Sequence, residues 1–126
     1  KITVFGGSQV RPNIHIKDMV RVYDHFIENC DQIDSGNFNA GFENISILDI
    51  AEMIVSKIPA EIVVTDSNDP RSYRQNSNKL LKTGFLNKFC VQDAVDEIIE
   101  KYNVGELEER DEYFTVKTMK LLGLNI

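Results

Sequence analysis

Apolar residues recur with the period of an α-helix in several parts of this sequence. Between residues 18 and 30 they fall at i, i+3, i+4, i+7, i+8 and i+11, namely at Met19, Val22, Tyr23, Phe26, Ile27 and Cys30. Such a stripe is typical of a helix that buries one face. Further helices are predicted over residues 46–57, 77–82, 91–102 and 113–122. Ser46 is a good N-cap for its helix, because Asp49 stands where the acidic residue of a capping box belongs.

Strands are predicted to be few and short. Residues 1–16 contain two of them, separated by a Gly6-Gly7 turn, and Pro12 makes the second an edge strand or a bulge. Its Val10, Ile14 and Ile16 share one face by alternation. Residues 37–41 and the β-branched residues 61–65 are also predicted strands. Because isolated short strands do not form a stable sheet, we expect some to pair with strands outside this sequence.

Composition narrows the functional classes. The 126 residues suit one domain, and 20 acidic against 14 basic residues give a net charge of −6. Nucleic acid and anionic membranes are therefore poor partners, and no apolar run spans a bilayer. Cys30 and Cys90 are expected to be reduced thiols in a cytoplasmic protein without a signal peptide.

The most distinctive polar segment is DPRSYR, residues 69–74. Its two arginines beside a tyrosine could bind phosphate, because the guanidinium group matches phosphate oxygens with paired donors. Arg11, which follows the glycine turn, is a third candidate. The alternative is that all three arginines are surface charges or pair with the many carboxylates of the chain.

Other residues are weaker candidates for chemistry. His15 is predicted to be a packed or capping residue rather than a catalyst, and neither histidine has companions at metal-ligand spacing. The Gly6-Gly7 turn lacks the spacing of a dinucleotide-binding loop and no helix is predicted after it. Tyr113 and Lys117 have the Tyr-x-x-x-Lys spacing of short-chain dehydrogenases, but such pairs are common on helices.

Four segments in order resemble the C-terminal half of extended short-chain dehydrogenase/reductases, the NAD-dependent nucleotide-sugar epimerases and dehydratases. They are ITVFGGSQVRPNIHI, the following KDMVRVY, FNAGFENISILDIAEMI, and DPRSYRQNSNKLLKTGF. The resemblance covers nearly the whole chain, residues 2–100. Asn13 stands where the family often has an aromatic residue, Thr83 where it has leucine, and Asn76 where it has aspartate.

The resemblance implies an α/β fold, more closely an α+β lobe that is rich in helices and has a few short strands. In the family this lobe binds the substrate and packs against an N-terminal Rossmann domain. It implies one segment over residues 1–126, with an acidic stretch and terminal helix at 106–126. In the family, one arginine after the glycine turn and one in the later loop bind the substrate diphosphate. The implied substrate-binding residues are Gln9, Arg11, Arg71, Tyr73 and Asn76, with Arg74 an alternative to Arg71.

The same resemblance implies a function in carbohydrate (surface polysaccharide) biosynthesis, with a nucleotide-diphosphate sugar as ligand. The family's NAD-binding loop and catalytic residues would lie upstream, so we expect this chain to be an inactive fragment without a catalytic or NAD-binding residue. Its expected partners are the missing Rossmann half or a second copy of itself. The alternative is a stand-alone, non-catalytic binding or interaction module derived from that lobe.

Overall fold

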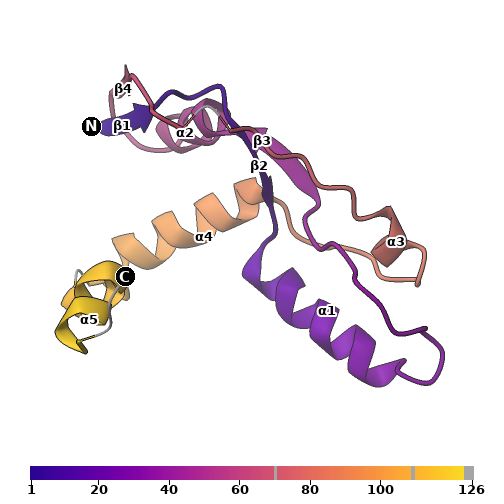
Figure 1. The fold of residues 1–126 in the computed structure, drawn as a ribbon. Coiled ribbons are helices and arrows are strands. Elements are labelled where there is room, and N and C mark those ends of the chain that lie inside the picture. The colour runs from indigo at the N-terminus through magenta and orange to yellow at the C-terminus, as the bar shows by residue number, and fades with distance from the viewer. Residues whose placement is uncertain (70, 109, 124–126) are drawn as a thin grey trace. The chain divides into compact units, whose positions relative to one another are not determined.

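Four short strands form two separate two-stranded sheets in the computed structural model, which describes residues 1–69, 71–108 and 110–123. Strand β1 (Ile2–Phe5) pairs in parallel with β4 (Ile62–Thr65), and Ile2 lies opposite Ile62. Strand β2 (Val10–Asn13) pairs antiparallel with β3 (Glu43–Ser46), as Figure 1 shows. The strand expected over residues 37–41 is therefore wrong. The strand in this part of the chain is β3, which begins at Glu43. Glu43 lies opposite Asn13, the last residue of β2.

Helices occupy most of the remaining regular structure. They are α1 (Ile16–Glu28), α2 (Ile47–Val55), α3 (Asn78–Leu81), α4 (Val91–Asn103), the 3₁₀ turn η1 (Asp111–Tyr113) and α5 (Thr115–Leu121). All five expected helices are present, with shifted ends. This small α/β arrangement confirms the predicted α/β class.

The N-termini of α1 and α2 are capped by side chains. Ser46 Oγ accepts from the Asp49 amide at 3.0 Å, and Asp49 Oδ2 accepts from the Ser46 amide at 3.3 Å, which confirms the capping box. His15 caps α1, because its Nδ1 accepts from the Lys17 amide at 3.1 Å. Helix α1 therefore begins at Ile16, and the expected placement of Ile16 on a strand face is wrong.

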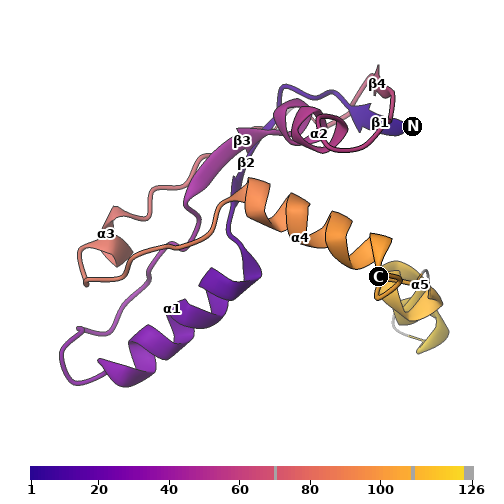
Figure 2. The ribbon, with the colours of Figure 1, turned by 180° about the vertical axis from the view of Figure 1, so that it is seen from behind.

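The chain divides into two compact units, residues 1–96 and 97–126, which are described separately. In the first unit, α2 packs beside the parallel pair β1–β4 (Figures 1 and 2). Val22 of α1, Leu80 of α3 and Phe85 form a buried cluster, against which Phe26 and Phe38 are packed. This cluster anchors the segment after α3 to α1.

The second unit contains several ion pairs between residues close in sequence. Lys101 pairs with Glu106, Arg110 with Glu108 at 3.1 Å, and Lys117 with Asp111 at 3.0 Å. These contacts place several carboxylates of the expected acidic stretch against basic side chains of the same unit. Glu109 and residues 124–126, which belong to that expected segment, lie outside the described residues. Within the described ranges, no helix is both long and apolar enough to span a bilayer.

Candidate functional site

The loop after residue 70 is fixed alongside strands β2 and β3 by hydrogen bonds. The Tyr73 amide donates to the carbonyl of Val10 at 3.0 Å, and the Val10 amide donates to Ser72 Oγ at 3.0 Å. Further along, the Gln75 amide donates to Asn44 Oδ1 at 2.8 Å and the Asn44 side chain donates back to the Gln75 carbonyl at 3.0 Å. This pairing brings the arginine-containing loop beside Arg11.

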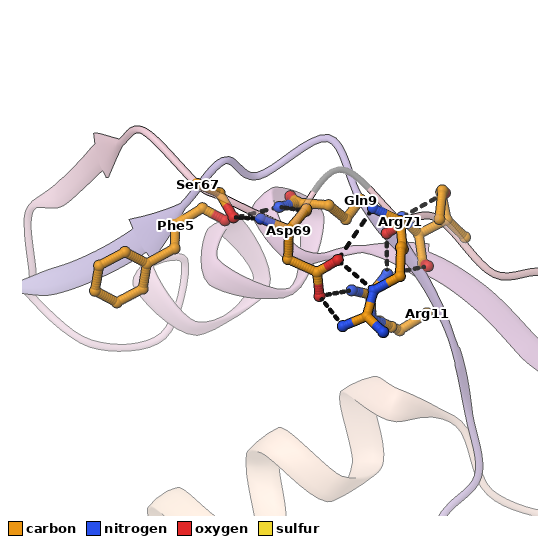
Figure 3. Close-up of polar contacts among 8 residues, drawn as sticks. Phe5, Gln9, Arg11, Ser67, Asp69 and Arg71 are labelled. Atoms are coloured by element: carbon orange, nitrogen blue, oxygen red, sulfur yellow. Dashed lines mark hydrogen bonds and ion pairs between the residues drawn. The ribbon is translucent and has the colours of Figure 1, made fainter.

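Asp69 lies between two arginines that are 60 positions apart in sequence (Figure 3). Arg71 binds it with a fork, through Nε to Oδ1 at 2.6 Å and Nη2 to Oδ2 at 2.9 Å. Arg11 Nη2 reaches Asp69 Oδ2 at 3.4 Å. Both phosphate-binding candidates therefore converge on a single carboxylate.

Arg11 has further contacts that fix its guanidinium group. Its Nη1 donates to the carbonyls of Arg71 at 2.6 Å and of Val10 at 3.0 Å. The guanidinium carbon also lies 5.1 Å from the centroid of the Tyr73 ring, within the range of a cation–π contact. Arg11 is 28% exposed, whereas Arg71 is 68% exposed. One cation is therefore fixed and partly covered, and the other is open to solvent.

Gln9 links the glycine turn to the same loop. Its Nε2 donates to the carbonyls of Phe5 and Asp69, both at 3.1 Å (Figure 3). The side chain folds back over Gly6, where an added Cβ would lie 2.4 Å from Gln9 Nε2, and Gly6 has a φ of +79°. Gln9 is buried, and its Oε1 has no hydrogen-bond partner among the described residues. Its contacts are those of a residue that positions the loop.

The charges of this cluster stabilise one another. Hydrogen bonds from the Arg71 side chain and amide lower the pKa of Asp69 to about 2, and Arg11 contributes by its charge. Reciprocally, the Asp69 carboxylate raises the pKa of Arg71. All three groups are charged at neutral pH, so Arg11, Arg71 and Asp69 together carry a net charge of about +1.

The predicted residues are not all in one place. Gln9, Arg11, Arg71 and Tyr73 meet around Asp69. Asn76 instead accepts from the Asn78 amide at 2.8 Å at the start of α3, and lines a separate pocket of about 260 Å³ with Gly41 and Ser77. Arg74, the alternative to Arg71, is exposed. Pro70 of the same motif lies outside the described residues.

Sequence reasoning missed Asp69 and Ser72 as parts of the site. Asp69 stands two residues before Arg71, a spacing that permits a local carboxylate–guanidinium pair, and this signal was available. The alternative that all three arginines are surface charges or pair with carboxylates holds for Arg11 and Arg71 in that both contact Asp69.

The Gly6-Gly7 turn does not provide a dinucleotide-binding loop. Strand β2 follows it, whereas a dinucleotide loop opens into a helix whose N-terminus faces the pyrophosphate. The first amides of α2 are already used, since Ile47 N–H donates to the Gln9 carbonyl at 3.1 Å and Leu48 N–H to the Gly7 carbonyl at 2.9 Å. The residues described here do not fit NAD at this turn.

Two other features singled out in the sequence can be located in the structure. Tyr113 ends η1 whereas Lys117 lies in α5, where it binds Asp111, so the pair does not share one helix. In the described part of the chain, no group of three or more histidine, cysteine or acidic residues is arranged to hold a metal ion. A search of protein-family models found none that matches this chain.

Proposed function

We propose that this chain is the nucleotide-sugar-binding lobe of an NAD-dependent epimerase or dehydratase. The observation that carries the proposal is the convergence of Arg11 and Arg71, from distant parts of the sequence, at one loop. The resemblance to that family independently assigns these two positions to the substrate diphosphate.

The arrangement suits a diphosphate chemically. A guanidinium group has five N–H donors, so Arg71 can bind a phosphate oxygen while its Nε and Nη2 hold Asp69. Arg11 is preorganised by two carbonyls and the Tyr73 ring, which reduces the entropy lost when a ligand binds. The net positive charge of the cluster favours an anion, although Asp69 partly offsets it.

Within this proposal the chain binds and orients the sugar nucleotide, and the hydride chemistry belongs to NAD. The NAD site is assigned to another part of the enzyme, because the glycine turn here does not fit a dinucleotide. The exposure of the parallel pair β1–β4 is consistent with a further domain that packs against it. Parallel strands are normally covered on both faces, yet Phe5 and Val64 are 63% and 52% exposed.

Calorimetry on the full chain tests the proposal. Titrations with uridine- and thymidine-diphosphate sugars should show binding, and Arg11→Ala or Arg71→Ala should each weaken it about tenfold to a hundredfold. Arg11→Lys should restore binding only in part, because an ammonium group lacks the fork geometry.

Arg110→Ala is the matched control, since Arg110 also forms surface ion pairs but lies in the other unit. An Arg74→Ala variant tests whether Arg74, rather than Arg71, binds the diphosphate. The proposal is overturned if no nucleotide sugar binds, or if the Arg11 and Arg71 variants bind as tightly as the Arg110 variant.

A further inference from the structure

Asp69 is a fixed negative charge inside the proposed anion site (Figure 3). Its Oδ1 accepts from the Arg71 amide at 3.1 Å and from Arg71 Nε at 2.6 Å, and its Oδ2 accepts from Arg71 Nη2 at 2.9 Å. Because one of these bonds comes from the backbone two residues away, the carboxylate is held in place independently of the Arg71 side chain. An anion bound by Arg71 therefore lies next to Asp69 and is repelled by it.

Arg11 brings its guanidinium group to the same carboxylate. Its Nη1 donates to the carbonyls of Val10 and Arg71, and its Nη2 lies 3.4 Å from Asp69 Oδ2. With hydrogen bonds of about 2.9 Å, a phosphate on the remaining donors of either guanidinium group lies about 7 Å from the Asp69 carboxylate. A ligand that uses both arginines is therefore always exposed to the charge of Asp69.

The repulsion between Asp69 and a bound anion grows with the charge of the anion. Asp69 is partly exposed, so dielectric constants of about 40 to 80 describe its field. At a separation of about 7 Å, each unit of negative charge on the ligand then lowers its affinity about threefold to tenfold. This separation is shorter than the Debye length of about 10 Å at 0.1 M salt, so salt does not remove the effect.

Ligands that contain a diphosphate differ in charge. A diphosphate that is esterified at both ends, as in a nucleotide sugar, carries one negative charge on each phosphate. The terminal phosphate of a free nucleoside diphosphate has a second pKa of about 6, so near pH 8 this ligand carries about −3, and a nucleoside triphosphate carries about −4. A site made of arginines alone would favour the free nucleotides, because its attraction rises with ligand charge.

We propose that Asp69 is a specificity-determining residue, which favours diphosphates esterified at both ends over free nucleotides of higher charge. The inference rests on the proposed function, because it places the diphosphate on the same two arginines. Arg11 and Arg71 supply two positive charges and Asp69 cancels one of them, so the attraction for every additional ligand charge is reduced. Hydrogen bonds from Arg71 lower the pKa of Asp69 to about 2, which keeps its charge in place at neutral pH.

Calorimetry on the full chain tests the inference with three ligands that share a base and differ in charge. A uridine-diphosphate sugar, uridine diphosphate and uridine triphosphate are titrated near pH 8 without divalent cations. Asp69→Asn removes the charge and keeps the size of the side chain. In this variant the affinity for uridine diphosphate, relative to that for the sugar, should rise about threefold to tenfold over the ratio in the unmodified chain. The corresponding ratio for uridine triphosphate should rise about tenfold to a hundredfold.

The affinity ratios separate the charge of Asp69 from its effect on the position of Arg71. A role in orienting Arg71 alone would change the affinities for all three ligands by the same factor and leave their ratios unchanged. Asp69→Glu retains the charge and should keep both ratios within about twofold of those of the unmodified chain. Asp66→Asn is the matched control, since Asp66 is an exposed carboxylate in the same loop, and it should also leave the ratios within about twofold.

Two outcomes would contradict the inference while the proposed function stands. One is that the nucleotide sugar binds but Asp69→Asn leaves both ratios unchanged. The other is that Asp69→Glu shifts the ratios as much as Asp69→Asn does, which would assign the effect to the shape of the side chain rather than to its charge. If the unmodified chain does not bind the nucleotide sugar, the proposed function and this inference both fail.

Discussion

Asp69 is a carboxylate at the centre of a proposed anion site, so its charge state decides the electrostatics there. Arg71 and Arg11 stabilise the ionised form, which is why the pKa of Asp69 is lowered to about 2. The carboxylate therefore both orients the arginines and competes with a bound anion. Because Asp69 is ionised at neutral pH, it orients the arginines and competes with a bound anion at the same time.

This gives a prediction about pH. A group whose pKa is lowered on folding contributes stability that is present above its ordinary pKa of 3.8 and is lost as the pH falls through about 2. Carbon-detected NMR should show the Asp69 carboxyl titrating near pH 2, and Arg71→Ala should move its midpoint back towards 3.8. Asp66→Asn serves as a control for changes elsewhere in the loop. A midpoint in the unmodified chain near the ordinary value would contradict the Arg71–Asp69 geometry.

At the scale of elements, one buried carboxylate connects α1 to the segment before α4. Asp18 is fully buried in the first turn of α1, where it accepts from the amides of Lys88 at 3.0 Å and Phe89 at 2.9 Å, and from the Arg21 side chain. The segment that leads into α4 is therefore attached to α1 by charge-assisted hydrogen bonds.

Asp18→Asn should lower the free energy of unfolding by about 3 kcal/mol. The side-chain NH₂ group of asparagine would face the backbone N–H groups of Lys88 and Phe89, which need an acceptor, and the negative charge that binds Arg21 would be lost. Urea unfolding measures this loss. Glu28→Gln, on the exposed end of the same helix, should change stability by less than about 0.5 kcal/mol. Equal stability of the two variants would show that the Asp18 contacts contribute little.

Elements with strong local signals were predictable. The start of α2 is set by a motif of only four residues, from Ser46 to Asp49, and the capping box forms as expected. The strand expected over 37–41 failed because pairing with β2 selects residues 43–46, a choice made by distant residues. Among site residues, the resemblance predicted that Arg11 and Arg71 would meet. Local spacing is enough to suggest the pair between Asp69 and Arg71, but the contact of Arg11 with Asp69 depends on the pairing of the loop with β2, which local spacing does not reveal.

At the scale of the molecule, buried apolar side chains gather in the first unit. Val22, Leu80 and Phe85 form its cluster, whereas none of the described residues of η1 or α5 is buried. α5 has seven residues, and helices shorter than about 12 residues are marginal without packing. Its ion pairs are exposed, and exposed pairs contribute little. The two units should therefore differ in local stability.

Hydrogen exchange on the full chain, at a concentration where it is monomeric, measures that difference. The amides at the centre of α1 should exchange at least about a hundredfold more slowly than those of α5, because opening α1 exposes buried core and opening α5 exposes little. A Leu80→Ala variant should speed exchange in α1 and leave α5 unchanged, since Leu80 is fully buried beside Val22. Protection of α5 equal to that of α1 would mean that the terminal unit has a burial partner of its own.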